Sequence, residues 1–237
     1  MKQELSKKTR TESDLIGSRE VPESALYGVQ TLRGIENFRI SKFHLNEYPL
    51  FIQALAITKM GAAIANRELD LLTKEQTDAI LKACKEILEG KYRDQFPVDM
   101  IQGGAGTTTN MNANEVIANR ALELMGHQRG EYQYCSPNDH VNRSQSTNDA
   151  YPTAIHIGLY YTHLKLVKHF ETLIQSFRKK GEEFANIIKM GRTQLEDAVP
   201  MTLGQTFNGF ASILEHEVKN LDFAAQDFLT VNMGATA

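Results

Sequence analysis

Three short polar segments, each rich in hydroxyl and amide side chains, come directly before stretches with helical periodicity. We call them the first (residues 103–112), second (145–149) and third (193–194) polar segments. Helix N-termini attract anions through the helix dipole and through backbone N–H groups that lack helical partners. Three such segments that converge on one ligand would make a carboxylate or phosphate site. The hydroxyl and amide side chains in these segments include Thr107, Ser146, Thr147, Asn148, Thr193 and Gln194.

Each polar segment taken alone has a simpler interpretation. Ser, Thr and Asn before a helix usually act as caps or turn residues. The glycine-rich first segment is not a Walker loop, because no Gly-Lys-Ser/Thr follows it, and it lacks the GxGxxG pattern of dinucleotide-binding turns. The histidines show neither HxxxH nor HExxH spacing, so we expect no metal site. Only the joint occurrence of the three segments favours an anion site.

Apolar periodicity predicts a mainly α-helical fold. One helix is expected from about Pro49, where apolar residues recur at spacings of three or four. A second helix is expected over residues 74–89. Thr73 and Gln76 make a capping box at its start, and Gly90 provides its stop.

Weaker local signals predict the structure around these helices. Residues 1–45 are polar and irregular, and we expect an arm of turns around short extended pieces such as 38–40. Within the first polar segment, Asn112 and Glu115 resemble a further capping box. Pro152 is expected in the first turn of the helix that follows the second segment, where proline is tolerated.

The second half of the chain carries two long apolar stripes with a seven-residue repeat. They predict two helices of about 35 and 28 residues, the second capped by Thr202 and Gln205. Two helices cannot fully cover each other's stripes, so they need further helices from this chain or from other subunits. We expect an N-terminal domain over 1–145 and an incomplete helical bundle domain over 146–237. The stripes contain Leu159, Leu166 and Leu173, then Phe207, Leu214, Leu221 and Phe228.

Composition places the chain among soluble globular proteins. Its 237 residues are 41% hydrophobic with a net charge of −3, which excludes intrinsic disorder and gives no support for a nucleic-acid or anionic-membrane partner. The two cysteines, Cys84 and Cys135, are far apart in sequence and indicate a reducing compartment. Lys59 interrupts the best candidate for a spanning run, and no signal peptide is recognised. We therefore expect a cytoplasmic protein.

The chain resembles the aspartase/fumarase superfamily at these same residues, and the match extends over essentially its whole length. The resemblance implies a homotetramer with pooled long helices and composite active sites built from three subunits. It also implies elimination across a Cα–Cβ bond beside a carboxylate, through an aci-carboxylate intermediate and without a cofactor. The matching motifs are LIG at 15–17, YGVQTLR at 27–33, GAGT at 104–107, NMNANE at 110–115, SPNDHVN at 136–142, QSTND at 145–149 and GRTQLEDA at 191–198.

The resemblance also implies roles for individual residues. Arg33 is similar to an arginine that holds a carboxylate, although a solvated arginine in a turn is the alternative. Thr193 matches a contact supplied from a neighbouring subunit. The residues similar to ligands of the substrate carboxylates and amino group are Thr107, Ser146, Thr147 and Asn148.

Three positions favour the aspartase branch, with reversible elimination of ammonia from L-aspartate to give fumarate. Gln194 stands where fumarases usually have His, Thr147 where they have Ser, and Ser136 where they often have His. An amide cannot act as a general acid as an imidazole can, and ammonia tolerates that loss better than hydroxide would. Fumarate hydratase and a non-catalytic helical fragment are the alternatives.

The superfamily's flexible loop, a GSS segment followed by MPxKxN, carries its general-base serine and a carboxylate-binding lysine. Neither motif occurs in residues 1–237. Residues 232–237 match a superfamily segment that continues into further sequence. We therefore expect a truncated form with no catalytic residue of its own, which is inactive alone although the full-length protein is a carbon–nitrogen lyase.

Overall fold

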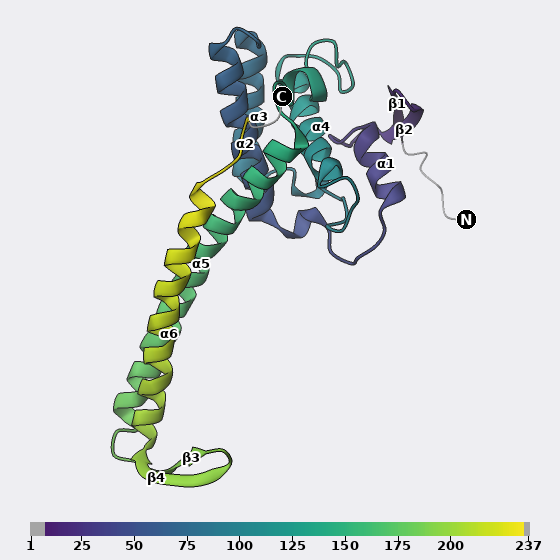
Figure 1. The fold of residues 1–237 in the computed structure, drawn as a ribbon. Helices are drawn as coiled ribbons and strands as arrows, with labels where there is room; N and C mark the ends of the chain where they lie inside the picture. The colour runs from purple at the N-terminus through teal and green to yellow at the C-terminus, as the bar shows by residue number, and fades with distance from the viewer. Residues whose placement is uncertain (1–7, 235–237) are drawn as a thin grey trace, which may run out of the picture. The chain divides into compact units, whose positions relative to one another are not determined.

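The computed structural model describes residues 8–234, and their fold is mainly α-helical, which confirms the expected fold class (Figure 1). The chain divides into two compact units. The first unit comprises Met1–Gly158 with Val231–Ala237, and the second comprises Leu159–Thr230. The domain division expected from the sequence, 1–145 and 146–237, stays a prediction.

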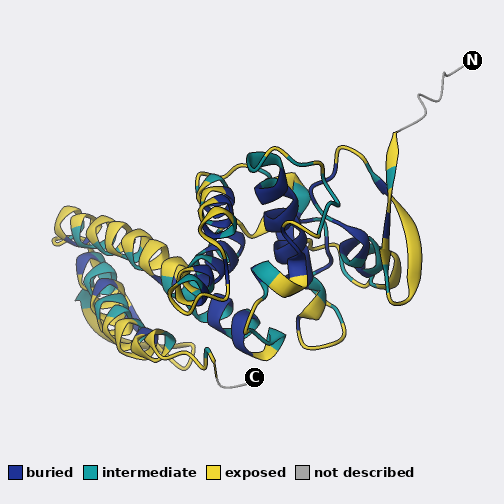
Figure 2. Cartoon of the chain, turned by 90° about the horizontal axis from the view of Figure 1, so that it is seen from above, coloured by how far each residue is buried: buried dark blue, intermediate teal, exposed yellow. Residues whose placement is uncertain are grey.

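Three helices build the core of the first unit: α2 (Pro49–Glu68), α3 (Lys74–Leu88) and α4 (Thr107–Leu124). Their buried residues gather where the helices face one another (Figure 2). Full burial of one large aliphatic side chain contributes about 1.5–3 kcal/mol, so this core fixes the position of α4 and of the polar segment before it. Buried members of the core include Leu55, Ile80, Ile87, Ile117 and Leu122.

The two capping boxes predicted at Thr73 and Thr202 are confirmed. At the start of α3, the Thr73 hydroxyl accepts the backbone N–H of Gln76 at 3.2 Å, and the Gln76 side chain accepts the N–H of Thr73 at 3.1 Å. Thr202 and Gln205 make the same reciprocal pair at 3.1 and 2.9 Å before α6 (Leu203–Ala225). Each box satisfies two N–H groups that the helix itself leaves without partners.

The expectation of an irregular arm is wrong for residues 8–45, and its first seven residues lie outside the described part of the chain. Residues 8–45 contain an antiparallel hairpin of β1 (Thr9–Asp14) and β2 (Gly17–Pro22), followed by α1 (Val29–Asn37). Residues 38–40, expected as an extended piece, lie outside any strand. The side chains that pair across this hairpin are polar: the hydroxyls of Thr9 and Thr11 on β1 donate to Glu20 on β2. Such polar pairing leaves no period-2 hydrophobic signal.

The capping box expected at Asn112 and Glu115 is also wrong. Helix α4 begins at Thr107, so both residues lie inside it and are buried. The position before the helix is Gly106, whose φ of 89° is left-handed and which has no side chain to cap with. The side chain of Gln102 takes that role, and its Oε1 accepts the N–H of Thr109 at 2.8 Å.

Asp99 holds together the chain segments that lead to α4. Its carboxylate accepts the backbone N–H groups of Ile40, Ser41 and Ile101 and the hydroxyl of Ser41, all at 2.7–2.9 Å. Burial opposes ionisation of Asp99, but these hydrogen bonds outweigh it and lower its pKa to about 2. Gln102, which caps α4, also donates to the Asp99 carbonyl at 2.8 Å.

The Asp99→Asn variant is expected to lose stability near neutral pH, because the amide offers one acceptor oxygen instead of two. The folded pKa lies below the unfolded value of roughly 3.9, so ionised Asp99 stabilises the fold above that value, and the contribution is lost as the pH falls towards about 2. The difference in urea midpoint between wild type and variant should therefore shrink in acid. Asp78→Asn, on an exposed part of α3, is the control. A difference independent of pH would contradict this account.

Helix α5 (Thr147–Glu183) begins in the first unit and continues into the second. Its 37 residues agree with the expected length, whereas α6 has 23 and then gives way to a short 3-10 helix, Gln226–Leu229. The predicted break between them is a hairpin of β3 (Ile188–Thr193) and β4 (Glu196–Thr202).

Within the second unit, α5 and α6 lie side by side (Figure 1). Arg178 pairs with Glu215 at 2.7 Å, and the rings of Phe177 and Phe207 are 6.0 Å apart. The leucines of the first stripe stay exposed, with Leu166 at 43%, whereas the members of the second stripe are half-buried, and Phe223 outside that stripe is 83% exposed. Over residues 8–234, none of the helices combines the length and apolarity needed to cross a bilayer.

Pro152 lies deeper in the helix than expected. It is the sixth residue of α5, in the second turn, so its missing N–H leaves the carbonyl of Asn148 without the usual helical donor. The side chain of Asn232, in the chain segment after α6, donates to that carbonyl at 2.9 Å. An interaction across 84 residues thus compensates for the proline.

Candidate functional site

The first and second polar segments meet in one pocket of the first unit. It has a volume of about 430 Å³. The Asn110 Nδ2 of α4 donates to the Thr147 Oγ1 of α5 at 3.3 Å, which joins the first turns of the two helices. The pocket is lined by Gln102, Ala105 and Gly106 beside the start of α4, by Asn148, Tyr151 and Pro152 of α5, and by Met100 and Ile155. Two of the three predicted segments therefore converge.

The hydroxyl groups at this convergence differ in what they can offer a ligand. Ser146 caps α5: its Oγ accepts the N–H of Asn148 at 3.1 Å, and Asp149 accepts the N–H of Ser146 at 3.0 Å. Thr147 Oγ1 likewise accepts a hydrogen bond, so both hydroxyls keep their own protons for another acceptor. Thr107 instead donates its proton to the Gly104 carbonyl at 2.7 Å. Ser146 and Thr147 thus keep a donor proton that Thr107 does not, while Asn148 is the predicted ligand that lines the pocket itself.

The third polar segment belongs to the second unit, where it forms the turn of the β3–β4 hairpin. Thr193 pairs with Glu196 across the turn. Gln194 and Leu195 have φ values of 47° and 66°, the left-handed region that two-residue hairpin turns require and that Asn and Gly usually fill. Non-glycine residues held in this region carry backbone strain, which clusters at functional sites. Thr193 and Gln194 therefore stay predicted ligands. The structure gives their positions within the β3–β4 hairpin.

Arg33 is not the solvated turn residue considered as an alternative. It lies in α1, and its guanidinium binds both carboxylate oxygens of Asp14 on β1 at 2.9 and 2.8 Å and the Gly17 carbonyl at 2.8 Å. These bonds lower the pKa of Asp14. The side chain is 13% exposed. Its contact with a substrate carboxylate stays a prediction, and in this structure its carboxylate partner is Asp14.

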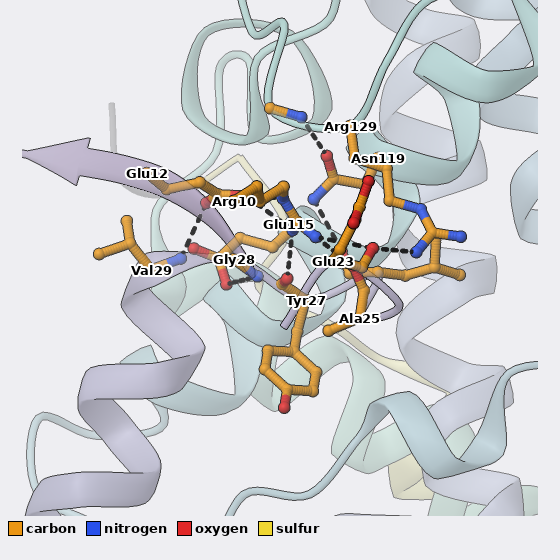
Figure 3. Close-up of polar contacts among 12 residues, drawn as sticks. Arg10, Glu12, Glu23, Ala25, Tyr27, Gly28, Val29, Glu115, Asn119 and Arg129 are labelled. Atoms are coloured by element: carbon orange, nitrogen blue, oxygen red, sulfur yellow. Dashed lines mark hydrogen bonds and ion pairs between the residues drawn. The ribbon is translucent and has the colours of Figure 1, made fainter. Parts of the chain in front are cut away.

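The N-terminus of α1 is occupied by two carboxylates of the protein itself (Figure 3). Glu115 on α4 accepts three backbone N–H groups within residues 28–31 at 2.8–3.0 Å, and Glu12 on β1 accepts that of Val29 at 2.9 Å. Burial raises the pKa of Glu115, and the hydrogen bonds counteract this. This helix end resembles an anion site but is filled internally, and it fixes α1, which carries Arg33, against α4.

Sequence reasoning missed one charged residue beside the second polar segment. Lys59 on α2 is fully buried, and its Nζ donates to Asn142 Oδ1 and Gln145 Oε1, each at 2.9 Å. The only signal in the sequence is a lone lysine inside the apolar run of α2, which shows that the position is unusual but not what it contacts.

Comparisons with known proteins agree with the helical architecture. A family model described as Lyase matches residues 17–237. Among curated relatives, aspartate ammonia-lyase from Escherichia coli strain K12 is 56% identical over 98% of this chain, and that from Pseudomonas canavaninivorans is 57% identical over 96%. The chain spans about half the length of these relatives, 49% and 48%.

Solved structures of lyases and fumarases are also similar to this chain. A fumarate lyase:delta crystallin from Brucella melitensis, in native form, has a TM-score of 0.94 and 50% identity, covering 96% of this chain and 53% of its own. A class II fumarase from Schistosoma mansoni has a TM-score of 0.85 and 37% identity, covering 97% of this chain and 48% of its own.

Proposed function

The chain belongs to the lyase family whose model matches residues 17–237, and from this membership we propose that it is part of an enzyme that reversibly eliminates ammonia from L-aspartate to give fumarate. The observation that carries the proposal is the meeting of the first two polar segments, where Asn110 donates to Thr147 and where Ser146 and Thr147 keep their protons for a carboxylate. The relatives named aspartate ammonia-lyase support this choice of substrate.

The chemistry requires fixed donors. A proton beside an ionised carboxylate is very weakly acidic, so its removal produces an aci-carboxylate with two negative charges on one group. Preorganised hydroxyl, amide and backbone N–H donors stabilise such a charge without reorganising at the moment of reaction. Ser146, Thr147 and Asn148 at the start of α5, with Thr107 at the start of α4, would receive the carboxylates and the amino group.

The active site in this proposal is composite. Thr193, and with it Gln194, would come from a neighbouring subunit of a homotetramer, and the exposed apolar residues of α5 and α6 would be buried in its central bundle. The exposure of leucines and phenylalanines along both helices supports this assembly, because apolar stripes of this length need partner helices. We place the assembled enzyme in the cytoplasm.

A second candidate is fumarate hydratase, favoured by the likeness to a class II fumarase. Gln194 argues against it, because the amide cannot supply the proton that a departing hydroxide needs. A third possibility concerns residues 1–237 as an isolated polypeptide, which we propose to be non-catalytic because the serine-bearing loop of the superfamily is not among them.

One assay separates these possibilities. Full-length protein and the 237-residue chain are each supplied with L-aspartate or L-malate, and fumarate is followed by its ultraviolet absorbance. We expect turnover of aspartate by the full-length protein only. Turnover of malate without aspartate would replace the leading proposal by the hydratase. Fumarate release by the short chain would show that the base lies within residues 1–237.

A further inference from the structure

Lys59 is a buried basic side chain whose hydrogen bonds go to neutral amide groups. It lies on α2 with 0% exposure, and its Nζ contacts two amide oxygens, those of Asn142 and Gln145. The ion pairs recorded across residues 8–234 do not include it. Burial lowers its pKa to about 7. A buried charge without an opposite charge is costly, so the fold keeps Lys59 at the expense of stability.

The contacts of Lys59 lead to the second polar segment by two routes. Gln145, which accepts from Lys59, directly precedes Ser146, and its backbone carbonyl accepts the side-chain N–H of Asn142 at 2.9 Å. On the other route, Asn110 donates to Asn142 Oδ1 at 3.1 Å and to Thr147 Oγ1 at 3.3 Å. Lys59 thereby holds the turn before α5 and connects to the hydroxyl of Thr147.

The same network contains buried oxygen atoms without partners. Asn142 Oδ1 receives three donors, from Lys59, Asn110 and Asn114, at 2.9–3.2 Å. Among the described residues, the side-chain oxygens of Asn110 and Asn114 are buried and have no hydrogen-bond partner. Each such oxygen lowers stability, because the loss of its contacts with water is not compensated by a hydrogen bond within the protein. An arrangement that concentrates donors on one oxygen and leaves others unpaired is not optimised for stability, which favours a functional reason for it.

We infer that Lys59 is a positioning residue for the carboxylate-binding end of α5. Its Nζ holds residues 142–145 through two hydrogen bonds, so that Ser146 and Thr147 present their hydroxyls to a substrate carboxylate. Lys59 does not itself contact the substrate. The inference rests on the proposed function, because it assigns the ligand of this helix end as one carboxylate of a four-carbon dicarboxylate.

The test uses Lys59→Met in the full-length protein, since methionine fills a similar buried volume without the charge. We expect KM for L-aspartate, and Kd for succinate measured by calorimetry, to rise about tenfold or more, with a smaller change in kcat. Succinate carries both carboxylates but no leaving group, so its Kd reports carboxylate binding alone. The matched control is Thr58→Val, on the neighbouring buried position, whose hydroxyl bonds to the Ala54 carbonyl of its own helix at 2.9 Å. It should lower the melting temperature without changing Kd.

A folded Lys59→Met enzyme with unchanged succinate Kd would overturn the inference and leave the proposed function standing. Should Lys59→Met fail to fold, Gln145→Met removes one acceptor of the ammonium group from a half-buried turn. A smaller rise in Kd is then expected, and no rise overturns the inference. Wild-type turnover of malate but not aspartate would refute the proposed substrate, while the succinate measurement still decides the role of Lys59. A wild-type enzyme that binds no dicarboxylate refutes both.

Discussion

Ser146→Ala in the full-length protein is expected to lower kcat for L-aspartate by roughly 10²–10³-fold, the usual effect of removing one preorganised donor from a developing oxyanion. The structure also makes Ser146 the cap of α5, through the Asn148 N–H. Loss of that cap costs about 1 kcal/mol, which lowers the melting temperature slightly. The effect on turnover should therefore far exceed the effect on stability.

The matched control is Thr73→Ala, because the Thr73 hydroxyl also caps a helix, α3, by accepting a backbone N–H, that of Gln76. It should cost a similar free energy of unfolding and leave kcat unchanged. Thr193→Ala, in the β3–β4 turn, should reduce kcat as Ser146→Ala does, since both are proposed to bind one substrate from different subunits. If Ser146→Ala and Thr193→Ala lower only the melting temperature, the two residues are a cap and a turn residue and nothing more.

The parts of the fold that could be predicted are those whose signals are local. The capping boxes at Thr73 and Thr202 were identifiable because both partners lie within four residues. The pair Asn112 and Glu115 has the same spacing, but Glu115 binds backbone groups 84–87 residues away. A short pattern cannot distinguish a cap from an acceptor for a distant helix. Both hairpins escaped prediction because their strands show no apolar alternation.

The candidate site was likewise predictable only in its local features and not in its long-range contacts. Its residue types could be identified from motifs, since hydroxyls and amides before helices are visible along the sequence. The meeting of the first and second segments could not, because the pair Asn110 and Thr147 is 37 residues apart. Lys59 is the clearest case: its partners lie 83 and 86 residues away, so in the sequence it only interrupts an apolar run.

Gly106→Ala is expected to give the largest loss of stability among single substitutions in the pocket. Gly106 has a φ of +89°, and a Cβ added there would lie 2.5 Å from ring atoms of Tyr151. The left-handed backbone costs a non-glycine residue about 1–2 kcal/mol, and overpacking against the ring adds about 1–3 kcal/mol. Because Gly106 and Tyr151 both line the pocket, displacement of the ring should also lower kcat.

Gly126→Ala separates the two contributions to the Gly106→Ala effect. Gly126 follows α4 with a φ of +84°, nearly that of Gly106, but a Cβ there meets nothing within 4 Å. Its substitution should therefore cost only the backbone strain in urea unfolding, and kcat should stay at the wild-type value. The difference between the two variants measures the contact with Tyr151. Equal losses of unfolding free energy in the two variants would mean that the Tyr151 ring moves aside freely. Glycine at position 106 would then be required by the backbone conformation alone.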